Sequence, residues 1–263
     1  MTQMVLRWGM VVWLLGAATV FADTAPNRER ESDRSPTFDA LIEAEKTARL
    51  LAVLLDSGRA VISANQPLFD GTSKGTKGFT PEAFERQLVE VFRSRSGLDL
   101  NDLASARLST KAVRLLRSLV SVSKQVMAEV QGQTHSDGTP SGVIPAVFGA
   151  RAAAQFTKRT GVQLKQTALA PRNPVNAPDP FEQAALQDFA DPAYPREKTI
   201  TEVTARSGAL HLMFPLYATR HCLDCHGEPK GEIDKTGYPK EGLQLGHNAG
   251  AISVVIPVPV VKK

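Results

Sequence analysis

Apolar residues recur every three or four positions through the first half of the chain, which is the spacing of an amphipathic helix. Thr80 precedes Pro81, and this pair is typical of a capping residue followed by the first position of a helix. Gly58 is expected to end the first helix, because glycine commonly follows the last helical residue. The pattern therefore predicts helices over residues 38–57, 80–96, 110–130 and 145–160.

The pattern changes in the second half of the chain, where apolar and polar residues begin to alternate in short runs typical of strands. These runs predict strands over residues 199–204, 209–214 and 251–258. Asp179, Pro180 and Glu182 form the capping signature of a short helix. The proline-rich stretch 170–180 should be an extended, stiff loop. We therefore expect an α+β protein whose N-terminal part, residues 38–140, is helical.

The connection between the last two expected strands carries recognisable chemistry. Cys222 and Cys225 lie three positions apart and are followed by His226, which is the Cys-x-x-Cys-His signature of c-type haem attachment. On one helical turn, the two thiols can reach the two vinyl groups of a porphyrin, and the histidine can ligate the iron. We expect one covalent haem c, with Cys222 and Cys225 as thioether links and His226 as the axial iron ligand.

The same cysteine spacing also occurs in zinc sites, in thioredoxin-like redox pairs and in disulfides. A cysteine zinc site usually needs a second pair of ligands, and the sequence has no other cysteine. A thioredoxin-like pair opens a helix after a buried strand in a βαβ setting, which the surrounding pattern lacks. Haem attachment is therefore the favoured interpretation of this stretch.

The N-terminus has the pattern of a secretory signal over residues 1–22. Arg7 supplies the positive charge, an apolar run follows, and residues 20–22 match the small-x-small cleavage pattern. An uncleaved anchor is the alternative, although the apolar run is short for a bilayer span. We expect a periplasmic protein without a membrane span in its mature chain, beginning with a disordered polar leader over residues 23–37.

Three short motifs follow one another in the second half, with the sequences PRNPVNAP (171–178), CLDCHG (222–227) and GAISV (250–254). Together they resemble a bacterial family of c-type haem-binding domains with a PAS-like fold, which occur alone or as exported sensor modules of histidine kinases and chemoreceptors. The resemblance implies a PAS-like antiparallel sheet flanked by helices and holding one covalent haem within residues 141–263. Residues 38–263 would then form a single haem domain.

Arg172, within the first motif, is the next candidate for haem binding. A guanidinium on a stiff loop is suited to bind a haem propionate bidentately. The alternative is a structural role, in which Arg172 bonds carbonyls of its own loop.

The sixth iron position is open. Some members of the family place a distal cysteine on the helix before the first motif, but residues 144–156 contain no cysteine here. We expect an iron without a strong sixth protein ligand, beside an apolar wall of Val147, Phe148 and Ala152. The alternative ligands in the mature chain are His135, His211, His247, Met127 and Met213.

These features favour an exported monohaem protein for one-electron transfer or for redox or gas sensing. No signalling segment is recognisable after residue 258, so we expect a sensor to need a separate signalling protein, as electron transfer needs a redox partner. The alternatives are a module whose haem is mainly structural, and a haem enzyme such as a peroxidase or a nitric-oxide-handling protein. The formal net charge of +4 is too small and scattered to indicate a nucleic-acid partner.

Overall fold

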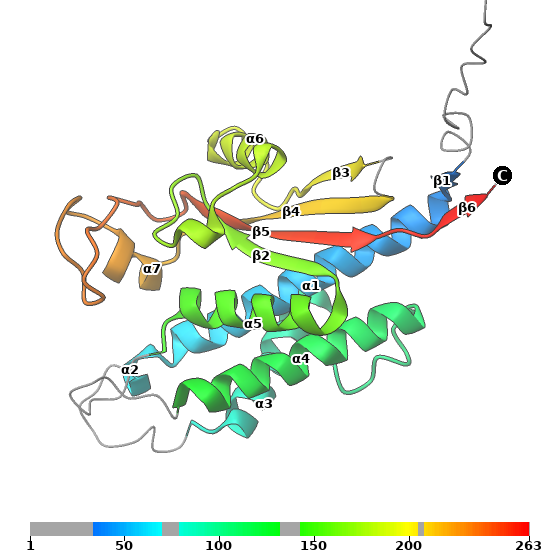
Figure 1. Cartoon of the computed structure of the whole chain (residues 1–263). Helices are drawn as coiled ribbons and strands as arrows, with labels where there is room; N and C mark the ends of the chain where they lie inside the picture. Colours follow the sequence, from blue (N-terminus) through cyan, green and yellow to red (C-terminus); the bar gives the residue numbers. More distant parts are fainter. Residues whose placement is uncertain (1–33, 70–78, 132–142, 205–207, 263) are drawn as a thin grey trace, which may run out of the picture.

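The computed structural model describes residues 34–69, 79–131, 143–204 and 208–262 (Figure 1). Its helices are α1 (Phe38–Ala64), α2 (Gln66–Phe69), α3 (Pro81–Ser96), α4 (Thr110–Gln131), α5 (Pro145–Thr160), α6 (Pro180–Ala190) and α7 (Arg220–His226). Its strands are β1 (Arg34–Pro36), β2 (Gln163–Thr167), β3 (Ile200–Thr204), β4 (Ala209–Tyr217), β5 (Asn248–Pro257) and β6 (Val260–Lys262). The protein is α+β, as the sequence predicts.

Strands β2, β5, β4 and β3 form an antiparallel sheet in that order. Helix α6 lies on one face of the sheet, and α1 and α5 lie on the other (Figure 1). Alternate residues of β4 serve the two faces because side chains alternate along a strand. Leu210 and Leu212 join the core shared with the helices, whereas Met213 packs under α6 with Leu186 and Phe189. The sheet therefore packs on a large hydrophobic core with α1, α3, α4 and α5 on one face and on a second, smaller hydrophobic cluster with α6 on the other.

Helix α1 is longer than the sequence predicts, and the expected end at Gly58 is wrong. Gly58 is buried inside α1, where an alanine Cβ would lie 2.8 Å from Cε1 of Phe148 on α5. Phe148 is itself fully buried and packs edge-on against Phe84 of α3, with ring centroids 5.2 Å apart. The glycine therefore permits a close approach between α1 and α5, and it does not mark a helix end.

The other local signals produce the expected boundaries. The Thr80 side chain accepts a hydrogen bond from the Ala83 amide at 3.2 Å, and Pro81 occupies the first position of α3. Asp179 and Glu182 form both bonds of a capping box at the start of α6. The proline-rich loop departs from a fully extended form, since residues 174–176 make a single 3-10 turn.

The described chain begins and ends in one small antiparallel sheet, in which β1 pairs with β6. Residues 34–36 therefore belong to the fold, and the predicted disordered leader over residues 23–37 extends too far because these residues form backbone pairs. Most of that leader, the predicted signal at residues 1–22 and His135 lie outside the described residues. Among the described helices, none combines the length and apolar character needed to cross a membrane.

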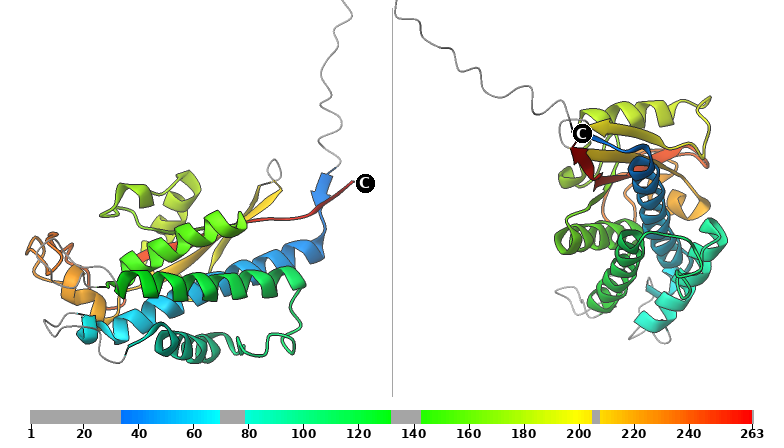
Figure 2. Two further views of the ribbon diagram at one scale, coloured as in Figure 1. Left: turned by 60° about the horizontal axis from the view of Figure 1, so that its bottom comes forward. Right: turned by 90° about the vertical axis from the view of Figure 1, so that its right-hand side faces the viewer.

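Helix α7 lies at the end of the molecule opposite the β1–β6 pair, in both Figure 1 and the left view of Figure 2. It interrupts the connection from β4 to β5, and the loop over residues 227–247 follows it. The ends of these two central strands, which pair from Ala209–Pro257 to Tyr217–Asn248, therefore set the place of α7.

Candidate functional site

The short helix α7 brings together the three residues of the Cys-x-x-Cys-His signature. Cys222 and His226 are four positions apart on this helix and so lie on the same face, with Cys225 one position before the histidine. The two cysteines are partly exposed, and the His226 side chain keeps 37% of its surface accessible. The helical placement expected from the sequence is confirmed, and all three side chains are reachable from outside the core.

The two cysteines are free thiols, with no disulfide between them. The sulfur of Cys222 accepts a hydrogen bond from the Thr219 amide, 3.4 Å away, at the start of the helix. Burial raises the pKa of the Cys225 thiol, and the negative charge of Asp234 adds to the rise.

The C-terminal end of α7 is held by two segments that are distant in the sequence. The last carbonyls of a helix have no partner within the helix. Here the Cys225 carbonyl accepts a hydrogen bond from Nη2 of Arg172 at 2.8 Å, and the His226 carbonyl accepts one from the Leu243 amide at 2.7 Å. The loop after β2 and the loop after α7 thus close the same helix end.

Arg172 is the centre of a network of charged side chains. Its Nη1 donates to Asp234 at 2.7 Å, and its Nε donates to Glu241 at 2.6 Å. The Asp234 side chain is fully buried. Burial alone would raise the pKa of Asp234, but hydrogen bonds from Thr236, Arg172 and the Tyr238 amide outweigh burial and hold this pKa well below its usual range. Asp234 is therefore a buried carboxylate that Arg172 neutralises.

The network differs from both roles considered for Arg172. The guanidinium bonds the end of α7 and two carboxylates of the following loop, whereas the structural alternative had it bonding carbonyls of its own loop. The propionate role stays a prediction, and a propionate would have to compete with Asp234 and Glu241 for the same N–H groups. Asn173 supports the loop itself, since its side chain accepts from the Val175 amide at 3.1 Å.

Glu241 connects this network to the histidine of the signature. Its Oε2 lies 2.7 Å from Nδ1 of His226 and accepts from Nη2 of Arg172 at 3.0 Å. Burial would raise the pKa of Glu241, but the hydrogen bonds from Arg172 and His226 outweigh burial and lower this pKa. Sequence reasoning missed both Glu241 and Asp234, because they lie in an irregular loop where no spacing relates them to Arg172.

The candidates for a sixth iron ligand lie in separate parts of the fold. Met127 is buried in the core of the helices, and Met213 is buried beneath α6. His211 is buried, and its Nε2 lies 2.7 Å from the Ser253 hydroxyl. His247 is exposed, and its carbonyl accepts from the Ala218 amide at 2.9 Å, close to the start of α7. Met213 and His211 therefore both pack inside the fold.

The predicted apolar wall beside the iron is wrong for two of its three members. Phe148 and Ala152 have no exposed surface, because both fill the core between α5 and the neighbouring helices. Val147 is exposed. Sequence periodicity identified the buried stripe of this helix correctly but could not say what the stripe faces.

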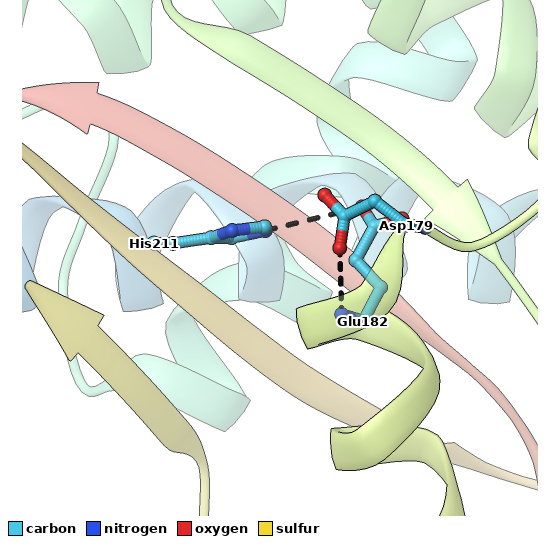
Figure 3. Close-up of side chains that lie close together, drawn as sticks. All are labelled: Asp179, Glu182 and His211. Carbon is cyan, nitrogen blue, oxygen red and sulfur yellow. Dashed lines mark hydrogen bonds and ion pairs between the residues drawn. The ribbon is translucent and has the colours of Figure 1, made fainter. Parts of the chain in front are cut away.

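A second cluster of polar side chains lies under α6, where His211 points toward the carboxylates of Asp179 and Glu182 (Figure 3). Ligand atoms of the three residues lie within 4.8 Å of one another. Asp179 and Glu182 already cap α6, and the Lys165 ammonium lies 2.6 Å from Glu182. Burial lowers the pKa of His211 although nearby carboxylates oppose the shift. Helix capping and the lysine account for this cluster without a metal ion.

The model of the Tll0287-like family matches residues 39–257. No curated protein matches the chain. Among solved structures, the crystal structure of the cyanobacterial heme-protein Tll0287 is similar at 19% identity with a TM-score of 0.35, over 61% of this chain and 97% of that chain.

Proposed function

This chain belongs to the Tll0287-like family, and from that premise we propose that it is an exported monohaem protein for one-electron transfer or for redox or gas sensing. In this proposal Cys222 and Cys225 bind one haem c covalently, and His226 is the axial iron ligand. The observation that carries the proposal is α7, which presents the two cysteines and the histidine on one accessible helix.

The residues of α7 fit a covalent haem by the chemistry of their donor atoms. Both thiols are partly exposed, and Nδ1 of His226 is engaged by Glu241, so Nε2 is the ring nitrogen left to bind iron. A bound haem supplies a one-electron iron couple and, where a coordination position is open, a site for a diatomic gas. The protein supplies the tether, the axial ligand and a helix fixed by the ends of β4 and β5.

We propose that the iron lacks a strong sixth protein ligand. Support comes from the burial of Met127 and Met213 and from the bonding of His211 to Ser253, which leave these side chains committed to the fold. Ferrous protein should then be high-spin and should bind carbon monoxide rapidly, as absorption spectra with and without the gas would show. A low-spin ferrous spectrum that carbon monoxide leaves unchanged would overturn the open-iron proposal, and a His247 variant that turns high-spin would identify the ligand.

Export to the periplasm and a PAS-like sensory role are further parts of the proposal. The sequence of residues 1–22 supports export, and N-terminal sequencing of the haem-loaded protein should begin at Asp23. An intact Met1 would point to an uncleaved anchor. An antiparallel sheet with helices on both faces supports the PAS-like assignment. A sensor of this kind would act through a separate signalling protein, whereas electron transfer would need a redox partner.

A further inference from the structure

His226, the proposed axial ligand, has a hydrogen-bonding partner that no sequence motif indicates. Oε1 of Glu241 accepts from Nε of Arg172 at 2.6 Å, and Oε2 accepts from Nη2 of Arg172 at 3.0 Å. The same Oε2 lies 2.7 Å from Nδ1 of His226. Two nitrogens of the planar Arg172 guanidinium therefore bind the Glu241 carboxylate bidentately, which fixes the orientation of the carboxylate as well as its distance.

This arrangement sets the tautomer of His226. A carboxylate paired with a guanidinium carries only acceptor atoms, so the hydrogen of the short contact must belong to Nδ1. The Nδ1–H tautomer leaves the lone pair of His226 on Nε2, which is the nitrogen farther from the backbone. The ring therefore offers Nε2 to a metal, with its plane held by Glu241.

The backbone reinforces the same geometry. The Leu243 amide donates to the His226 carbonyl at 2.7 Å, so the segment that carries Glu241 is docked on the end of α7 beside the histidine. Arg172 is anchored in turn by the buried Asp234 and by the Cys225 carbonyl. Glu241 is thus supported from both sides, although 42% of its own side-chain surface is accessible.

We propose that Glu241 is a positioning residue for the haem iron, acting through His226, with Arg172 holding it in place. This inference rests on the proposed haem attachment. A carboxylate that accepts a hydrogen bond from the ring nitrogen not bound to the metal orients the histidine ring. The same hydrogen bond makes the histidine a more basic ligand. A more basic axial ligand stabilises ferric iron more than ferrous iron, so Glu241 lowers the reduction potential of the haem.

The test compares Glu241→Gln with Glu232→Gln in the full, haem-loaded protein. Both variants remove one negative charge from the same loop, but Glu232 bonds Lys240 and not His226. Glu241→Gln should raise the reduction potential and lower the iron–histidine stretching frequency of the ferrous protein in resonance Raman spectra. Glu232→Gln should change neither quantity, and Glu241→Asp should remain closer to the wild type than Glu241→Gln because it keeps the charge.

The outcomes separate this inference from the proposed function. Equal potentials in wild type, Glu241→Gln and Glu232→Gln would overturn the role of Glu241 while leaving haem attachment intact. A wild-type protein without covalent haem would overturn the proposed function instead. If Glu241→Gln takes up less haem, the potential of the loaded fraction still decides, since thioether links hold the haem through purification.

Discussion

The buried ion pair between Arg172 and Asp234 should contribute much more to stability than an exposed pair of similar length in the same loop. Asp234 has no exposed side-chain surface and accepts hydrogen bonds from Arg172, the Tyr238 amide, and the Thr236 amide and hydroxyl. In Asp234→Asn, the amide oxygen can keep the bonds from Thr236 and Tyr238. The amide nitrogen then faces Nη1 of Arg172, which places donor against donor.

The size of the destabilisation in Asp234→Asn depends on which bonding partners Arg172 loses and which it keeps. Removing one partner of a fully buried ion pair costs about 3–5 kcal/mol. Arg172 retains Glu241 and the Cys225 carbonyl, so its charge is not left without partners. The free energy of unfolding should then fall by the contribution of one charge-assisted hydrogen bond and the cost of leaving its buried donor unpaired, or about 2–3 kcal/mol. Because Arg172 bonds both Asp234 and Glu241, the ion pair is expected to stabilise the loop that carries these two carboxylates.

The assay is urea unfolding of the haem-loaded protein, followed by far-ultraviolet circular dichroism at constant m value. Glu232→Gln is the matched control, because Glu232 pairs with Lys240 at 2.6 Å but keeps 52% of its side-chain surface exposed. Exposed pairs contribute little in high dielectric. Equal changes in the free energy of unfolding for the two variants would refute the reasoning that burial gives the Arg172–Asp234 pair its importance.

Two further predictions concern the core and the pH dependence of stability. Gly58→Ala gains about 1 kcal/mol of helix propensity, but its Cβ would lie 2.8 Å from Cε1 of the buried Phe148. A net loss of about 1 kcal/mol in urea unfolding is expected from overpacking, and a more stable variant would contradict it. Burial lowers the pKa of His211 below its ordinary 6.5, so on acidification the unfolded chain binds a proton before the folded protein does. Stability should therefore fall as the pH drops below about 6.5, and His211→Asn should flatten this dependence between pH 7.5 and 5.5, whereas an unchanged slope would count against the buried neutral histidine.

Local signals in the sequence predicted most of the elements, because capping and periodicity depend on neighbouring residues. Thr80 with Pro81, and Asp179 with Glu182, define the starts of α3 and α6 through bonds within one turn. Gly58 misled the same reasoning, since its function is a contact with Phe148, ninety positions away in the sequence. Whether a glycine ends a helix or admits a neighbour depends on packing that spacing does not record.

The candidate site likewise contains residues that the sequence could predict and residues that it could not. The cysteines and His226 are recognisable because haem attachment requires them at fixed spacing on one helical turn. Arg172, Asp234 and Glu241 come together only through the fold, as 69 positions separate Arg172 from Glu241. Sequence reasoning selected Arg172 for its charge and its stiff loop, but its partners in the 227–247 loop have no local signature.

The central claim is that Cys222 and Cys225 hold one haem covalently. The most direct measurement is the intact mass and absorption of the denatured protein, produced in a host with c-type maturation machinery. The wild type should carry the mass of one haem that denaturation does not release, and Cys222→Ala with Cys225→Ala should carry none. Wild-type protein that contains stoichiometric zinc and no porphyrin would contradict the claim.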